Sequence, residues 1–200
     1  MRKTLLAAAL ASAFIAAPAL AQDDIPADTP RAPDGTRAFG IDPYVAVLGG
    51  YERFDNRVGN GIPDTPANGG NNLDGALVQG IVGVNVPLGP VFVGAEGNVA
   101  KGISGDIDWQ YGAAGRFGVR AGDSGLIYGR VGYQWVNFEK RVPTNRDFHD
   151  VTYGAGFEVG PQDIGLGGIT GNSGFRLRGE VSTFGDFHSF RPTLGIVTHF

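Results

Sequence analysis

Most of this chain alternates between apolar and polar residues with a period of two. From Tyr44 onward, segments of about ten residues repeat this pattern and are separated by Gly, Pro, Asn and Asp, which is typical of strands joined by turns. In the clearest segment, Trp109, Tyr111 and Phe117 share one parity, whereas Arg116 and Arg120 share the other. An amphipathic helix would repeat every 3.6 residues instead. The chain is therefore expected to be all-β.

Eight such segments are present. They cover residues 44–54, 76–86, 91–99, 109–120, 127–135, 151–159, 175–182 and 190–200. The first segment fits least well, because Glu52 and Arg53 are adjacent and cannot face the same way. This is tolerable near the end of a strand, where water begins. We predict an eight-stranded antiparallel up-and-down β-barrel.

Three features favour a transmembrane barrel over a soluble, lipocalin-like one. The polar parity is rich in glycine, as suits a crowded interior: Gly83, Gly94, Gly112, Gly118, Gly132, Gly154, Gly156 and Gly195. After the first 21 residues only Lys101 and Lys140 remain, although strands that face water usually carry many lysines. Aromatic residues gather toward strand ends on the apolar parity, as in an interfacial girdle: Trp109, Tyr111, Tyr133, Trp135, Tyr153 and Phe190.

The charged parity should then face the barrel interior. A charge on the lipid face at mid-depth costs about 2–4 kcal/mol, and a sheet in hydrocarbon must close so that no edge is left unpaired. The expected interior charges are Glu96, Arg116, Arg120, Arg130, Glu158, Arg176, Arg178, Glu180 and Arg191. Because eight strands leave room only for side chains, we expect these charges to pair and fill the barrel. The alternative is a narrow, gated pore in which the excess of arginine favours anions.

Connection lengths predict the orientation. Residues 87–90 and 122–125 form tight turns, which belong to the periplasm, while 55–72, 102–106, 136–147 and 184–189 form loops, which belong to the exterior. Residues 160–174 depart from this rule, since a short turn is expected there. Either this segment is an insertion or the seventh strand begins before Phe175.

The N-terminal part is expected to be a signal peptide followed by a linker. Residues 1–21 combine Arg2 and Lys3, an apolar run and an Ala19-Leu20-Ala21 cleavage pattern, which predicts a cleaved signal peptide. Residues 22–38 hold Pro and Asp without periodicity and are expected to be a periplasmic linker. The barrel is assigned to residues 39–200, in the outer membrane of a Gram-negative bacterium.

The strands at 128–133 (YGRVGY) and 151–160 (VTYGAGFEVG), with the closing RPTLGIVTHF at 191–200, resemble the outer-membrane β-barrel family. Its members include opacity-type proteins, Omp25-like porin-family proteins and the OmpA membrane domain. The resemblance implies that alternate residues of the last strand are read by the barrel-insertion machinery; here they are Leu194, Ile196, Thr198 and Phe200. It also implies lipopolysaccharide around the outer half of the barrel and phospholipid around the inner half.

Composition excludes several functions. The chain has no Cys, and its net charge of −4 without a basic block speaks against nucleic acid. We predict no catalytic, cofactor-binding or metal-binding residues; the Asp106–Asp108 pair and the Asp-rich residues 55–74 are explained by loop composition. A lipid-modifying enzyme at the rim, using His188 and Ser189 with Asp186, is a remote alternative, because adjacent strand residues face opposite ways. The expected role is structural, with recognition of a host or environmental ligand by the outer loops.

Overall fold

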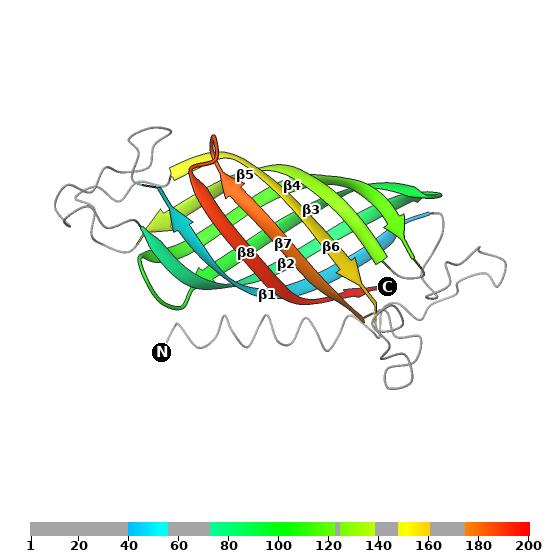
Figure 1. Ribbon diagram of the computed structural model, residues 1–200, viewed down its shortest axis with the longest axis horizontal. Helices are drawn as coiled ribbons and strands as arrows, with labels where there is room; N and C mark the ends of the chain where they lie inside the picture. Colours follow the sequence, from blue (N-terminus) through cyan, green and yellow to red (C-terminus); the bar gives the residue numbers. More distant parts are fainter. Residues whose placement is uncertain (1–39, 56–72, 123–124, 139–147, 161–174) are drawn as a thin grey trace.

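The computed structural model describes residues 40–55, 73–122, 125–138, 148–160 and 175–200. These residues form eight strands: β1 (Asp42–Phe54), β2 (Asp74–Leu88), β3 (Val91–Gly102), β4 (Ile107–Ala121), β5 (Gly125–Phe138), β6 (Phe148–Val159), β7 (Phe175–Phe184) and β8 (Ser189–His199). Each strand pairs antiparallel with its sequence neighbours, and β1 also pairs with β8, so that the sheet closes (Figure 1). The expected all-β, eight-stranded antiparallel barrel is confirmed.

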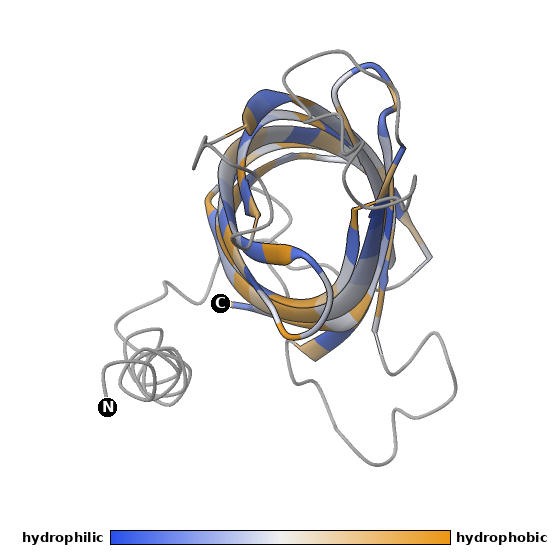
Figure 2. Ribbon diagram, turned by 90° about the vertical axis from the view of Figure 1, so that its left-hand side faces the viewer, coloured by the Kyte–Doolittle hydropathy of each residue, from blue (hydrophilic) through white to orange (hydrophobic). Residues whose placement is uncertain are grey.

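The two parities of each strand separate as expected. Along β4, for example, Tyr111 and Phe117 are exposed on the outer face, whereas Gln110 and Arg116 are buried inside. Seen from one end, the strands form a closed ring in which hydrophobic and hydrophilic stretches both occur (Figure 2). In β1, Glu52 points inward and Arg53 outward, which settles the one ambiguous segment.

The inward glycines lie where a side chain does not fit. A Cβ atom added to Gly112 would lie 2.5 Å from the carbonyl oxygen of Tyr133, and one on Gly154 would lie 2.9 Å from the Arg130 side chain. The outward Gly49 differs, since nothing lies within 4 Å of a Cβ atom added there. The expectation of a crowded interior behind the glycine-rich parity is confirmed.

The two ends of the barrel differ in their connections. The β1–β2, β3–β4, β5–β6 and β7–β8 connections lie at one end, which we call the loop end; both the start of β1 and the end of β8 lie at the other, the turn end (Figure 1). The turn at residues 89–90 joins β2 to β3 there. Strand β6 ends at Val159, and β7 is described from Phe175 onward. Most of the intervening segment, and the predicted signal peptide and linker, lie outside the described residues.

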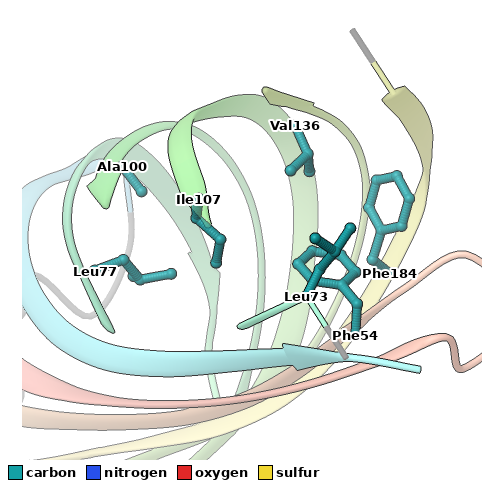
Figure 3. Close-up of a cluster of buried hydrophobic side chains, with 7 residues drawn as sticks. All are labelled: Phe54, Leu73, Leu77, Ala100, Ile107, Val136 and Phe184. Carbon is teal, nitrogen blue, oxygen red and sulfur yellow. The ribbon is translucent and has the colours of Figure 1, made fainter. Parts of the chain in front are cut away.

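The interior is apolar at the loop end. One cluster closes this end of the barrel with side chains from six strands and from the residue before β2 (Figure 3): Phe54, Leu73, Leu77, Ala100, Ile107, Val136 and Phe184. Phe138 and Phe148 pack against it. The Phe54 ring meets those of Phe138 and Phe184 edge-on, at centroid distances of 5.2 and 5.9 Å. We call this cluster the apolar cap.

Apolar side chains also line the interior toward the turn end. Two smaller clusters consist of Tyr44, Ala46, Leu48, Ile81 and Val197, and of Phe92, Leu126 and Tyr128. Within the described part of the chain, no helix is long and apolar enough to cross a bilayer.

Candidate functional site

The charged interior is centred on Arg178. From β7, its guanidinium donates to Glu96 of β3 at 3.0 Å and to Glu180 at 2.7 Å. Arg130 of β5 contacts the same two carboxylates, at 3.2 Å to Glu96 and 2.7 Å to Glu180. The side chains are at most 2 % exposed. Two arginines and two glutamates therefore compensate one another away from water, as buried charges require.

A second pair extends this cluster across the barrel. Arg116 of β4 donates to Glu158 of β6 at 2.8 Å, and its guanidinium lies 3.9 Å from Glu96. Glu158 in turn lies 3.8 Å from Arg178. Five strands, β3 to β7, thus exchange opposite charges through one continuous network.

Two tyrosines support the network from the turn end. Tyr44 donates its hydroxyl hydrogen to Glu96 at 2.6 Å, and Tyr128 donates to Glu180 at 2.8 Å. The Arg116 guanidinium lies over both rings, with its carbon 4.0 Å from the Tyr128 centroid and 4.9 Å from that of Tyr44. A cation over an aromatic face is attracted by the ring quadrupole.

A polar layer lies between this network and the apolar cap. Arg191 of β8 donates to Gln110 at 2.7 Å, to Gln134 at 3.2 Å and to Ser182 at 2.9 Å. Gln110 donates to Glu52 at 2.5 Å and accepts from Gln134 at 2.7 Å. The layer therefore ties β1, β4, β5, β7 and β8 together.

A histidine lies at the turn end of the network. The His199 ring places Nδ1 3.0 Å from Asp42 and Nε2 2.8 Å from Glu158, which connects β8 with β1 and β6. Asn85 donates to Asp42 at 3.3 Å, and Arg176 lies 3.9 Å from Glu158. Both ring nitrogens of His199 therefore face carboxylates, and the ring joins Asp42 to Glu158.

The sequence reasoning missed part of this interior. It included three acidic residues, whereas the structure adds Asp42 and Glu52, and it did not foresee the roles of His199, Tyr44 and Tyr128. The alternation within each strand could have identified these residues. Tyr128 lies on the same inward face as Arg130, and Glu52 lies on the same inward face as Leu48. Arg120 is half-buried, near the end of β4.

The missed acids correct the expected excess of positive charge. Among the described residues, five buried acids face five buried arginines and one histidine: Asp42, Glu52, Glu96, Glu158 and Glu180 against Arg116, Arg130, Arg176, Arg178, Arg191 and His199. Selectivity for anions was inferred from six arginines facing three glutamates. With Arg120 half-buried on the same parity, six arginines face five acids, so the excess of arginine is much smaller than that inference assumed.

The rim residues do not form a catalytic pair. The His188 Nδ1 atom lies 3.0 Å from Asp55, whereas Ser189 donates to Glu52 at 2.7 Å inside the barrel. The Ser189 hydroxyl also accepts from the Phe184 amide at 3.0 Å. No group of three metal-ligating side chains occurs among the residues described by the structure.

The six aromatic residues of the predicted girdle lie toward the loop end, on the outer face. Tyr111 and Trp135 stack at a centroid distance of 5.5 Å, and Tyr133 meets Trp135 edge-on at 5.0 Å. Tyr133 also contacts His149 Nδ1 at 2.6 Å. Trp109 lies opposite Lys101 on the neighbouring strand. The two other residues of the predicted girdle, Tyr153 and Phe190, also lie on the outer face.

The last strand shows the expected alternation. Leu194 and Ile196 are 56 % and 57 % exposed on the outer face, and Thr198 and Phe200 are half-exposed. The Phe200 amide donates to the Pro43 carbonyl oxygen at 3.0 Å and so extends the pairing of β8 with β1.

Comparisons with known proteins find likeness only in structure. No family model matches the chain, and no curated protein matches it. The solved structures similar to it include Ail, the attachment invasion locus protein of Yersinia pestis, at 15 % identity and a TM-score of 0.49, covering 80 % of this chain and 98 % of Ail. Neisserial surface protein A is similar at 10 % identity and a TM-score of 0.46, covering 80 % and 99 % of the two chains. At such identities the likeness is one of fold.

Proposed function

We propose that this chain is an outer-membrane β-barrel whose interior is filled and whose loop end faces the cell exterior. The proposal rests on one observation: the outer face of the barrel is apolar, and the inner face carries the charges. Large apolar side chains such as Val82, Phe117 and Ile196 are 57–63 % exposed outside, while arginines and glutamates are enclosed. A soluble barrel places these faces the other way round, whereas hydrocarbon accepts the outer face and requires a closed sheet.

The role that fits this interior best is structural support and surface recognition. The central arginines and glutamates each lie within 4 Å of an opposite charge across the lumen, and the apolar cap lies between them and the loop end. Such a barrel contributes to the envelope as a rigid body and offers its outer loops to a host or environmental ligand. In this role the loops carry the specificity, as is common for loops on a rigid scaffold.

The remaining expectations belong to the same proposal. Residues 1–21 direct export and are cleaved, and residues 22–38 are a periplasmic linker. Strand β8 and Phe200 present the alternation read by the insertion machinery. Lipopolysaccharide surrounds the loop-end half of the barrel, and phospholipid surrounds the turn-end half.

The competing function is a gated pore, and electrical recording separates the two. We expect the refolded protein to insert into planar bilayers without steady current, and the variants Glu158→Gln and Arg130→Ala to change stability but not conductance. A gel shift between unheated and boiled samples verifies that the barrel has formed. Current in the wild-type protein that changes with either variant would instead establish the pore.

Fractionation tests the location. The processed protein should appear in the outer-membrane fraction and migrate differently before and after boiling. Recovery as a soluble periplasmic protein contradicts the proposal as a whole, whatever the electrical result.

A further inference from the structure

A groove runs over the outer face of the barrel. It has a volume of about 470 Å³ and crosses strands β1 to β5. That size lies within the roughly 300–1,000 Å³ of sites that hold small ligands. Its floor is made of small outward residues, Gly80, Gly97 and Ala113, and its walls are Val82 and the stacked Tyr111–Trp135 pair.

The groove continues along β3 and β4 toward the turn end. A second hollow shares Val82, Gly97 and Ala113 with the first and adds Ala95 and Gly115. A Cβ atom on Gly97 or on Gly115 would lie no closer than 3.9 Å to any other atom. Small residues thus leave open space here, unlike the inward glycines, which pack against their neighbours.

A cation lies above the groove at the loop end. Lys101 of β3 faces outward opposite Trp109 of β4, and its ammonium lies 4.9 Å from the indole centroid. Asp108 also pairs with Lys101, and both side chains are about two-fifths exposed. An ammonium carries three donors, so one carboxylate does not exhaust them, and an exposed pair of this kind is weak.

We propose that this groove binds one acyl chain of an anionic, phosphorylated lipid of the outer leaflet, whose phosphate contacts Lys101. The proposal rests on the proposed membrane location and adds a defined lipid site to it. Charge complementarity selects the occupant: the groove itself is apolar, and the cation stands only at its loop end. An aromatic ring beside the lysine suits the boundary between acyl chains and headgroups.

The dimensions agree with a single leaflet. Lys101 and Ala95 are six residues apart on one strand, which corresponds to roughly 20 Å at ~3.3 Å per residue. With the strand tilted by about 35–45°, this is a depth of roughly 15 Å. That is half of the ~30 Å hydrocarbon thickness, so the groove ends where one leaflet's acyl chains end.

Tryptophan fluorescence can report on this site directly. The chain has two tryptophans, and both belong to the site: Trp135 lines the groove and Trp109 lies beside Lys101. The refolded barrel is placed in vesicles that mix brominated phosphatidylglycerol or brominated phosphatidylcholine with unbrominated phosphatidylcholine. Quenching then gives the relative affinity of each lipid. We expect about a five-fold preference for the anionic lipid.

Three variants separate the site from the surrounding lipid. Lys101→Gln should remove the preference, and Gly97→Phe should remove it by filling the groove, since a side chain at Gly97 meets open space. The control Ala155→Phe adds the same ring on the outer face of β6, away from the groove, and should keep the preference. Equal quenching by both lipids in the wild-type protein, or a preference that survives Lys101→Gln, overturns the proposal. A heat-modifiable barrel in these vesicles shows that such failure concerns the lipid site and not the membrane location.

Discussion

At the residue scale, the interior charges act as a set rather than as independent pairs. Arg116 and Glu158 are joined at 2.8 Å, yet each also lies near a further opposite charge. Removing one partner leaves the other buried charge with one ion pair fewer, and breaking a buried pair costs about 3–5 kcal/mol. Removing both leaves an uncharged gap, which is less costly.

A double-mutant cycle tests this coupling. We expect Arg116→Met and Glu158→Gln each to lower the free energy of unfolding by about 3–5 kcal/mol, and the double variant to lose clearly less than the sum. The measurement is urea unfolding of the barrel in vesicles, followed by tryptophan fluorescence. The outward pair Lys101–Asp108, treated by the same cycle, should show a coupling of at most about 1 kcal/mol. Additive losses for the inner pair would contradict the network.

At the element scale, neighbouring strands lock together through glycines that face tyrosines. Gly83 of β2 is the register partner of Tyr44, and Gly156 of β6 is the partner of Tyr128. A Cβ atom on Gly156 would lie 2.5 Å from the Tyr128 ring carbon that bears the hydroxyl. The glycine therefore lets the ring lie flat over the next strand, with its hydroxyl directed at Glu180.

Gly156→Ala should displace that ring. We expect a loss of about 1–3 kcal/mol in unfolding free energy, as for other overpacked sites. Gly49→Ala is the matched control, because it also adds one methyl group to a strand but meets nothing within 4 Å. Chemical unfolding of both variants checks the difference. An equal effect at the two positions would show that strand propensity, not the contact with Tyr128, determines the loss.

The strands were predictable from the sequence, and their contacts across the lumen were not. Alternation assigns a face to each residue, which is why Arg130 and Glu180 were expected inside. Partner choice depends on the stagger of the closed sheet, which brings Arg178 to Glu96 although they are 82 residues apart. The apolar cap was not predicted because the inward parity was described only by its polar residues and glycines, and because cap members such as Val136 and Phe184 were assigned to loops.

At the scale of the whole molecule, the barrel is closed by layers of different chemistry. The apolar cap lies at the loop end, the polar layer beneath it, and the charged network in the middle. Phe184→Ala should remove about 3–5 kcal/mol from the unfolding free energy by leaving a cavity in the cap. The exposed Phe190, 60 % accessible on the outer face, is the control, and its replacement by Ala should have a smaller effect. A lower midpoint of the heat-modifiability transition for Phe184→Ala alone would bear this out.

The orientation of the whole barrel is testable with single cysteines, because the chain has none of its own. Ile103, 68 % exposed in the β3–β4 connection, lies at the loop end, and Leu88, 52 % exposed at the end of β2, lies at the turn end. If the loop end faces outward, a membrane-impermeant maleimide added to intact cells should label Ile103→Cys and leave Leu88→Cys unlabelled. After the envelope is permeabilised, both should react, which shows that the second thiol is accessible. The reverse pattern would place the turn end outside and move Lys101 and the lipid groove to the inner leaflet.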